Sequence, residues 1–321
     1  MKKFLALVLA LVMVLAMCVS ASAAEAEEPY LVFVSPLLGN AVWDIAHNAF
    51  LEAIEDNGWN GEVVGPTTVS PEEMANLLDI AIAQGAKGVL TQGLMPGEAV
   101  DRAVEDGVTI MFVDGDNKAS GGTFAFVGKD MKKEAELFYE EVCKQIGQDE
   151  KIVLSIQKSV LATEVDKAEV DAVDEVFSKH PGGYERVNLT LINSDTAKGV
   201  TEWENTFNTY PEINVCLNCC AEAAQACCKA ADEKGITDDL IILGVDDLDV
   251  TLDLIREGKC DGTVAVSFWA YGYQSAVWLH EHVVEGRNPE NRENPAALLM
   301  VTPENIDTYG AEMKTFEHLP E

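Results

Sequence analysis

Residues 30–65 read YLVFVSPLLGNAVWDIAHNAFLEAIEDNGWNGEVVG, and this stretch contains the unit from which the chain is built. It begins with a short β-rich run, Tyr30–Val34. Apolar residues at helical spacing follow, up to a glycine stop at Gly58, and the short run EVVG comes next. A strand, a helix and a second strand in this order indicate two parallel strands joined by a helical crossover.

The same alternation continues along the chain. The next helix, SPEEMANLLDIAIAQG, has Ser70 as N-cap, Pro71 in its first turn and Glu73 three residues after the cap. The further strands that we expect are GVLTQ, VTIMFVD, TFAFVG, KIVLSIQ, YERVNLTLIN, INVCLN, LIILGVD and GTVAVS. The further helices are Ala99–Val104, Glu164–Ser178, Ala197–Thr209, AEAAQACCKAADEKG, Asp249–Glu257 and Tyr271–Val284. The pattern predicts an α/β fold with two doubly wound parallel sheets and helices on both faces of each.

The N-terminus has the features of a secretory signal. Lys2 and Lys3 precede an apolar run, and residues 21–23, Ala-Ser-Ala, form a small-x-small cleavage site. We therefore expect a signal peptide over residues 1–23 and an extracytoplasmic protein, in the periplasm or on the bacterial cell surface. An alternative cut before Cys18 would leave a lipid-anchored protein.

The composition limits the partners. The formal net charge is −33, so the surface repels phosphate backbones and anionic lipid heads, and we expect no nucleic-acid partner. Apolar residues make up 48% of the chain, which is enough for packed cores, and a length of 321 residues is typical of two domains. After the signal, no segment is apolar for long enough to span a bilayer.

The sequence carries no motif typical of an enzyme or a cofactor site. No G-x-G-x-x-G or G-x-x-x-x-G-K-[ST] opens a predicted helix. His280 and His282 lie two residues apart on a predicted helix, so their side chains point to nearly opposite sides and cannot share a zinc ion. The strand ends carry no nucleophile–base pair. We expect a protein that is not an enzyme and has neither a cofactor nor a metal ion.

Two adjacent cysteine pairs lie in LNCCAEAAQACC, residues 217–228. Cys219 and Cys220 follow a predicted strand, whereas Cys227 and Cys228 lie two helical turns further on, about 12 Å away at the usual rise. One metal ion cannot bind both pairs without distorting the helix. We expect Cys216, Cys227 and Cys228 to pack as small apolar residues.

Polar residues at the strand ends are the candidates for ligand binding, because ligands of such sheets bind beyond the carboxyl ends of the strands. Asp114 and Asp246 end predicted strands in different halves of the chain, and an ionised carboxylate there can accept ligand hydroxyls. The alternative is that they cap the helices or turns that follow. Asn40 and Gln92 are neutral amides that can bond hydroxyls, or that stabilise turns instead.

Several passages in order resemble the sugar-binding ABC-transporter substrate-binding proteins of the type I periplasmic binding protein family, similar to ribose-binding protein. These passages are VSPLLGNAVWDIAHNAFLEAIEDNGW, LDIAIAQGAKGVLTQG, VTIMFVDGD, TYPEINVCLNCCAEAAQACCKA, IILGVDD and LLMVTPENID. The likeness runs from about Tyr30 to Tyr309. It implies two lobes that close on a ligand about a three-segment hinge, with crossovers near Gly128, Ser267–Trp269 and Leu298–Met300. The implied first lobe is residues 28–128 plus 270–298, and the second is 129–269 plus 299–321.

The resemblance also implies positions in the cleft. Trp43 and Trp269 lie at family aromatic positions, where a ring can stack on a sugar, with core packing as the alternative and Phe268 as a competitor of Trp269. Cys220 lies in the turn where the family usually has Asn-Asp. Glu164 lies near the place of a family arginine that this chain lacks, and an acidic lining there would suit an amine-bearing or less polar ligand.

The implied function is capture of a sugar or a similar small molecule and its delivery to the membrane permease subunits of an ABC importer, by a monomeric binding protein. The alternative is a sensor of the same fold, which presents a signal molecule to a membrane receptor.

Overall fold

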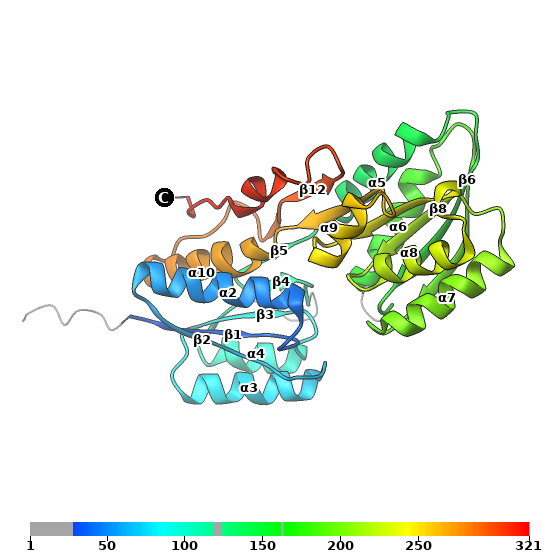
Figure 1. Cartoon of the computed structure of the whole chain (residues 1–321). Helices are drawn as coiled ribbons and strands as arrows, with labels where there is room; N and C mark the ends of the chain where they lie inside the picture. Colours follow the sequence, from blue (N-terminus) through cyan, green and yellow to red (C-terminus); the bar gives the residue numbers. More distant parts are fainter. Residues whose placement is uncertain (1–27, 118–122, 162–163, 321) are drawn as a thin grey trace, which may run out of the picture.

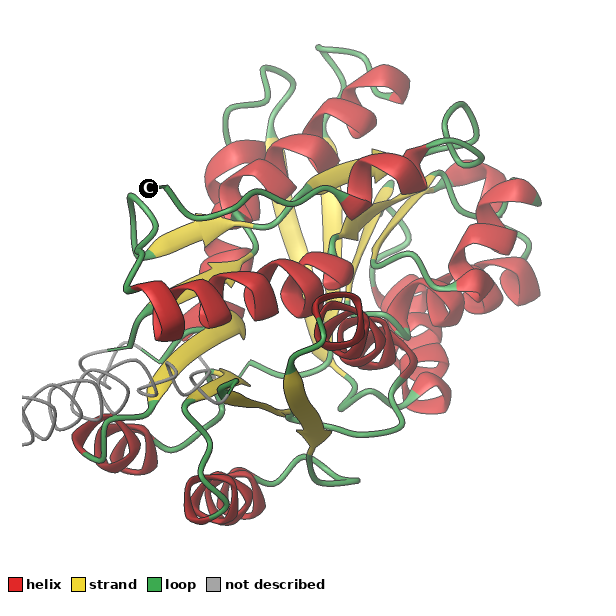
Figure 2. Cartoon of the chain, turned by 90° about the vertical axis from the view of Figure 1, so that its left-hand side faces the viewer, coloured by secondary structure: helices red, strands yellow, loops and turns green. Residues whose placement is uncertain are grey.

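The computed structural model describes residues 28–117, 123–161 and 164–320, without the side chains of residues 164 and 165. Its strands form two six-stranded sheets, each in a lobe of its own (Figure 1). Helices cover both faces of the sheets, as Figure 2 shows. The predicted fold class, two α/β lobes built on doubly wound sheets, is confirmed.

The first sheet has the order β11-β5-β4-β3-β1-β2, and all its pairings are parallel. Its strands are β1 (Tyr30–Val34), β2 (Asn60–Val64), β3 (Gly88–Gln92), β4 (Thr109–Asp114), β5 (Ala125–Gly128) and β11 (Glu293–Pro295). Its helices are α2 (Ala41–Asn57), α3 (Pro71–Ala83), α4 (Gly97–Glu105) and α10 (Phe268–Glu285), which returns from the second half of the chain to pack along α2.

The second sheet repeats this plan, in the order β12-β10-β9-β8-β6-β7. Its strands are β6 (Ile152–Lys158), β7 (Tyr184–Leu191), β8 (Val215–Cys219), β9 (Ile241–Val245), β10 (Gly262–Val266) and β12 (Leu298–Val301). Its helices are α5 (Met131–Gln145), α6 (Glu164–Phe177), α7 (Thr196–Thr209), α8 (Ala223–Lys234) and α9 (Asp249–Arg256), with short 3₁₀ turns η1 (Thr237–Asp239) and η2 (Tyr309–Lys314). Only the edge strand β12 pairs in an antiparallel direction.

Each sheet is buried on both faces. In β1, Leu31 and Phe33 pack with α2 and α10, whereas Val32 and Val34 pack against the α3 and α4 side. Such strands are apolar at every position because both faces contact helices. In the second lobe, Cys216, Cys227, Cys228 and Cys260 belong to one apolar cluster. The expected apolar packing of the first three of these thiols is therefore confirmed.

The helix α5 follows the first crossover and was not among the predicted elements. Nearly half of its sequence, MKKEAELFYEEVCKQ, is charged, and its apolar residues lie on a narrow face that buries Ala135, Phe138 and Val142. The side chain of Asp130 caps the helix by accepting a hydrogen bond from the Lys133 amide. The cap is visible in the sequence, but the narrow apolar face makes the helix hard to detect.

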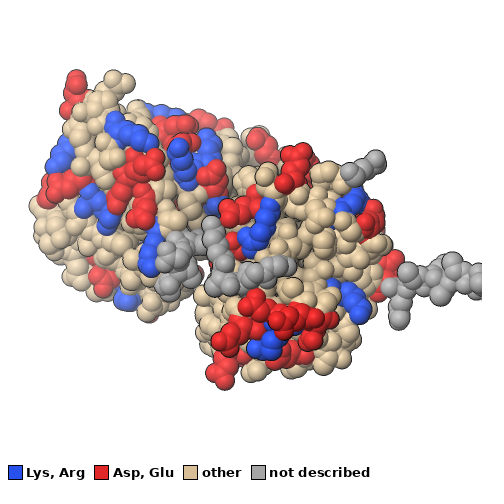
Figure 3. Space-filling model, turned by 180° about the vertical axis from the view of Figure 1, so that it is seen from behind, with Lys and Arg blue, Asp and Glu red and all other residues tan. Residues whose placement is uncertain are grey.

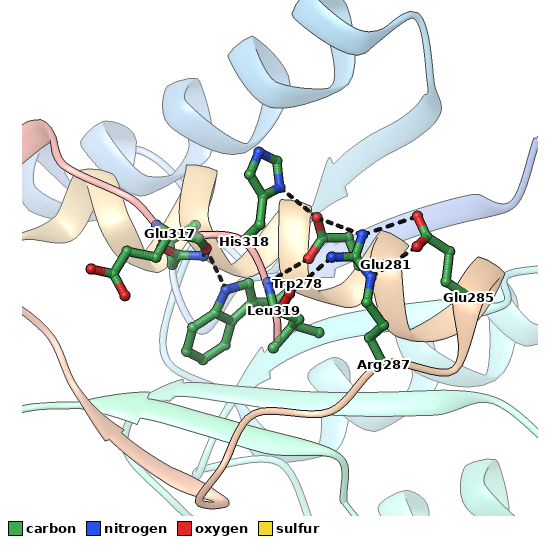
Figure 4. Close-up of polar contacts among 8 residues, drawn as sticks. Trp278, Glu281, Glu285, Arg287, Glu317, His318 and Leu319 are labelled. Carbon is green, nitrogen blue, oxygen red and sulfur yellow. Dashed lines mark hydrogen bonds and ion pairs between the residues drawn. The ribbon is translucent and has the colours of Figure 1, made fainter. Parts of the chain in front are cut away.

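The chain passes between the two sheets three times. The passages lie between β5 and α5, between β10 and α10, and between β11 and β12, close to the three predicted crossovers. After η2, residues 315–319 lie against α10 of the first lobe (Figure 4). We call these residues the C-terminal strap.

Hydrogen bonds hold the strap to α10 and to the residues just after it. The indole Nε1 of Trp278 donates to the Glu317 carbonyl at 2.7 Å, and the Leu319 amide donates to Glu281 Oε2 at 2.8 Å. Arg287 Nη1 donates to the Leu319 carbonyl at 2.9 Å. The strap therefore contacts the first lobe, although it belongs to the segment that the sequence assigns to the second.

Within the described ranges, no helix is both long and apolar enough to cross a membrane.

Candidate ligand-binding cleft

A cavity of about 220 Å³ lies between the lobes, where the carboxyl ends of both sheets meet. The first sheet and its helices contribute Asn40, Trp43, Asp114 and Phe268. The second lobe contributes Ser159, Ser194, Cys219, Cys220, Glu222 and Asp246, and Lys129 lies at the first crossover. A larger hollow of about 560 Å³ lies at the opposite end of the first sheet, around Tyr30 and Lys87, but it draws on one lobe alone.

Asp114 and Asp246 occupy equivalent places in the two lobes. They stand at the carboxyl ends of β4 and β9, which have the same position in their sheets. Both have left-handed backbone conformations, with φ of 61° and 65°. Aspartate tolerates this conformation better than most residues, but it still stores strain, and strained residues cluster at functional sites. The Asp246 turn is held by Thr263, whose hydroxyl donates to the Asp246 carbonyl at 2.7 Å.

Burial raises the pKa of both carboxyls. For Asp246 the pKa is raised to about 7, because exclusion of water and the nearby carboxyls of Asp114, Asp247 and Glu134 outweigh the attraction of Lys129. The pKa of Asp114 is also raised by burial, against the opposing effects of Lys129 and of a hydrogen bond from Gln92. The cleft therefore holds two aspartates whose charged forms are disfavoured.

Lys129 is a cleft residue that the sequence analysis missed. Its Nζ lies 3.0 Å from Glu134 Oε2 and 3.0 Å from Glu169 Oε1, and both carboxylates are almost fully buried. Burial opposes the charge of Lys129, but Glu134, Asp246 and Asp114 outweigh it, so the pKa is raised and the amine stays protonated. The buried Lys158 pairs with the other oxygen of Glu169.

Two rings form an aromatic wall on the first-lobe side of the cavity. Trp43 in the first turn of α2 and Phe268 at the start of α10 meet edge to face, with centroids 5.5 Å apart. Trp269 does not share this wall, which corrects the predicted position. Its Nε1 donates to Glu52 at 3.1 Å and its ring stacks on Tyr273, so it points away from the cavity. One step along a helix turns a side chain by about 100°.

Asn40 and Gln92 both make the local hydrogen bonds that the alternative interpretation gave them, and their contact with a ligand stays a prediction. Asn40 lines the cavity, but its Oδ1 caps α2 by accepting hydrogen bonds from the amides of Val42 and Trp43. Gln92 lies behind Asp114: its Nε2 donates to Asp114 Oδ2 at 3.3 Å, and its Oε1 accepts from the Leu94 amide. Gln92 therefore orients the carboxylate.

The second-lobe wall is made of small neutral groups. The hydroxyls of Ser159 and Ser194 lie 2.9 Å apart, and Ser194 is also left-handed, with φ of 56°. Burial raises the pKa of the Cys219 and Cys220 thiols to about 12, so both stay neutral at physiological pH. No cluster of three or more His, Cys, Asp or Glu side chains in the described ranges could hold a metal ion. Glu164 begins α6, and its side chain lies outside the described part.

Two α/β lobes with a cavity between the carboxyl ends of their sheets define a two-lobed binding protein. Residues 31–288 match the model of the periplasmic binding protein domain, and the chain belongs to that family.

Three solved structures of similar fold have descriptions that name a ligand or a partner protein. GanP, a glucose-galactose binding protein from Geobacillus stearothermophilus, is 18% identical with a TM-score of 0.78, over 88% of this chain and 99% of that chain. An ABC transporter solute-binding protein from Burkholderia graminis, in complex with D-arabinose, is 17% identical with a TM-score of 0.80, over 89% and 99%. The XylFII-LytSN complex contains a chain that is 21% identical with a TM-score of 0.75, over 86% and 98%. At these identities the likeness shows the fold.

Proposed function

We propose that the protein captures a sugar or sugar-like small molecule outside the cytoplasm and delivers it to the permease of an ABC importer. The observation that carries this proposal is the cavity between the lobes, which has a strand-end aspartate from each lobe and an aromatic wall. Solved neighbours described as binding glucose and galactose, or D-arabinose, support the ligand class.

The cleft residues suit such a ligand. The apolar face of a sugar ring packs on an aromatic side chain, and here Trp43 and Phe268 offer that surface. Asp114 and Asp246 accept hydroxyl hydrogen bonds from opposite sides. The cavity, at about 220 Å³, is smaller than the roughly 300–1,000 Å³ of typical drug-sized pockets, which favours a ligand of about one sugar ring.

We further propose that the ligand closes the lobes about the three chain passages. This proposal includes the division into two lobes, residues 28–128 plus 270–298 and residues 129–269 plus 299–321. The C-terminal strap belongs to the second lobe by this division but contacts the first. Export by a signal peptide over residues 1–23, or a lipid anchor at Cys18, falls outside the described residues and stays a prediction, as does the monomeric state.

A thermal-shift screen of mature protein against monosaccharides, followed by calorimetry, tests the ligand class. We expect at least one sugar to raise the melting temperature and bind with a stoichiometry of one. The matched variants are Trp43→Ala, inside the cavity, and Trp269→Ala, outside it. Trp43→Ala should weaken binding at least tenfold, and Trp269→Ala should leave it within threefold. The reverse order of the two variants would place the ligand elsewhere.

The sensor function is the second candidate, and one observation favours it. XylFII, which has the same fold, is solved together with LytSN. A binding protein that signals would hold a membrane receptor domain in its ligand-bound state, whereas an import protein would stimulate ATP hydrolysis by its permease complex. Reconstitution with the transporter in vesicles separates the two: ligand-dependent ATPase stimulation supports import.

A further inference from the structure

The charges around the cavity do not balance. Among the described residues, Lys129 lines the cavity, and the buried Lys158 shares the partner Glu169 with it. Glu134 is a second partner of Lys129. Those two glutamates already match the two lysines. Asp114 and Asp246 are left over, and in the described part of the chain neither has a Lys, Arg or His within ion-pair distance.

This surplus of negative charge has a physical consequence for the ligand. A carboxylate that loses water needs a compensating charge or a proton, because an unpaired buried charge is strongly unfavourable. A ligand hydroxyl donates a hydrogen bond but brings no charge. An ammonium group brings one positive charge and three donors, which is enough to contact both carboxylates.

The other walls of the cavity also suit a cation. Trp43 and Phe268 present ring edges and faces, and aromatic faces attract cations electrostatically. Tyr271, one turn after Phe268 and in contact with its ring, is fully buried, and its hydroxyl has no hydrogen-bond partner. Burial raises the pKa of this hydroxyl, and the charged side chains that also influence that pKa are Asp114, Lys129, Asp246 and Glu134. These four side chains lie in or beside the cleft. Tyr271 does not line the cavity, so its unpartnered hydroxyl adds polarity behind the Trp43–Phe268 wall and makes no direct ligand contact.

We propose that the ligand carries a positively charged amine, held between Asp114 and Asp246 beside the Trp43–Phe268 wall. This inference rests on the proposed function and narrows its ligand to an amino sugar or a similar amine-bearing small molecule. A bare metal ion is a poorer fit, because the described His, Cys, Asp and Glu side chains form no cluster of three that could hold one.

Proton release gives this inference a signature of its own. Lys129, Asp114, Asp247 and Glu134 surround Asp246, whose carboxyl is partly protonated near pH 7. A bound ammonium favours the ionised carboxylate and expels that proton. Binding of an amine should therefore tighten as the pH rises from about 5 to about 7, where the amine is still protonated. Below pH 7 it should release protons, which calorimetry in buffers of different ionisation enthalpy detects. A neutral sugar brings no positive charge that would favour the ionised carboxylate of Asp246, so its binding should not release this proton.

The experiment compares matched ligand pairs by calorimetry at pH 6.5, where an amino sugar is protonated and Asp246 still holds most of its proton. The pairs are D-glucosamine against D-glucose and D-galactosamine against D-galactose, with N-acetyl-D-glucosamine as a bulky neutral control. Ethanolamine and putrescine represent amines that are not sugars. We expect the amino member of at least one pair to bind tenfold or more tightly than its neutral parent, with proton release.

Asp246→Asn should remove most of that preference. Asparagine keeps the shape of the side chain and tolerates the left-handed φ of 65°, so the fold should be retained. Glu52→Gln, which removes an exposed carboxylate from the outer side of the first lobe, is the charge-matched control and should leave the preference unchanged.

The outcomes separate the inference from the proposed function. A neutral parent that binds as tightly as its amino partner overturns the amine inference and leaves sugar capture standing. Binding of the non-sugar amines alone supports the amine inference and overturns the sugar class. Failure of every probe to bind overturns both.

Discussion

At the scale of single residues, the two left-handed aspartates are the carboxylates that the strand ends of the two sheets bring to the cavity. Asp114 and Asp246 end apolar, buried strands, so their side chains can only emerge at the carboxyl edge of the sheet. For this reason the sequence alone predicted both. Lys129 could not be predicted in the same way, because its role depends on Glu134 and Glu169, which come from two different helices.

The Lys129 pairs yield a stability prediction. Lys129→Met should leave the buried carboxylates of Glu134 and Glu169 short of positive charge and should lower the free energy of unfolding by about 3–5 kcal/mol, measured by urea denaturation. Adding Glu134→Gln should recover part of the loss. Lys151→Met, which breaks an exposed pair with Glu185, should change stability by less than about 1 kcal/mol. A loss for Lys129→Met as small as that of Lys151→Met would contradict the ion-pair account.

The raised pKa of Asp246 yields a pH prediction. The folded protein holds a proton at Asp246 up to about pH 7, whereas the unfolded chain releases it near the usual value of about 4. The folded state therefore binds more protons between these values, and its stability should fall as the pH rises from about 4 to about 7. Asp246 is half-buried and keeps part of its surface exposed, so solvent screening reduces the full effect of the shift and we expect a contribution of about 1–2 kcal/mol. Asp246→Asn should flatten this slope, measured as urea midpoints across the pH range, and an unchanged slope would refute the shift.

At the scale of elements, helix caps decide which side chains face the cleft. Ser267 caps α10, and its Oγ accepts from the Ala270 amide at 3.0 Å, so the helix starts at Phe268. That start directs Phe268 to the cavity and Trp269 to the outer surface. The sequence shows two adjacent aromatic residues at a strand-to-helix junction, but the helical phase depends on the cap geometry. The buried strands were easier to predict, because their apolar runs are bounded by turn residues.

The C-terminal strap yields a prediction for an element. Removing residues 315–321 takes away Leu319, which is 2% exposed, and the hydrogen bonds to Trp278, Glu281 and Arg287. Burial of one leucine contributes about 1.5–3 kcal/mol, and the lost bonds add to it, so the free energy of unfolding should fall by about 3 kcal/mol. A chain shortened by residues 320 and 321 alone is the control. Equal melting temperatures for both shortened chains would show that the strap does not stabilise the fold.

At the scale of the whole molecule, the alternation of strand and helix was sufficient to predict two doubly wound sheets, whereas the three crossovers came from the family resemblance. The surface charge was equally visible, and Figure 3 shows carboxylates gathered on the part of the first lobe where α3 and α4 lie. A strongly negative protein concentrates cations near its surface and, at low salt, speeds the association of a positively charged ligand with the protein. The shape of the cavity was beyond prediction, because it depends on how side chains of two lobes meet.

Closure of the lobes is testable in solution. A sugar or amine identified by calorimetry should reduce the radius of gyration measured by small-angle scattering, because the cleft residues come from both lobes. The comparison needs the same protein sample with and without saturating ligand. An unchanged radius at saturation would refute the hinge.

The most direct test of the central claim, that one ligand is held by carboxylates from both lobes, is calorimetry of two matched variants, Asp114→Asn and Asp246→Asn. A hydrogen bond to a charged group contributes about 1.5–3 kcal/mol, so each variant should weaken binding by about tenfold or more. The unliganded melting temperature should not fall below that of the unmodified protein, because asparagine tolerates the left-handed conformation and places no charge in the buried site. If either variant binds the ligand within threefold of the unmodified protein, the ligand is not held between the two lobes as described.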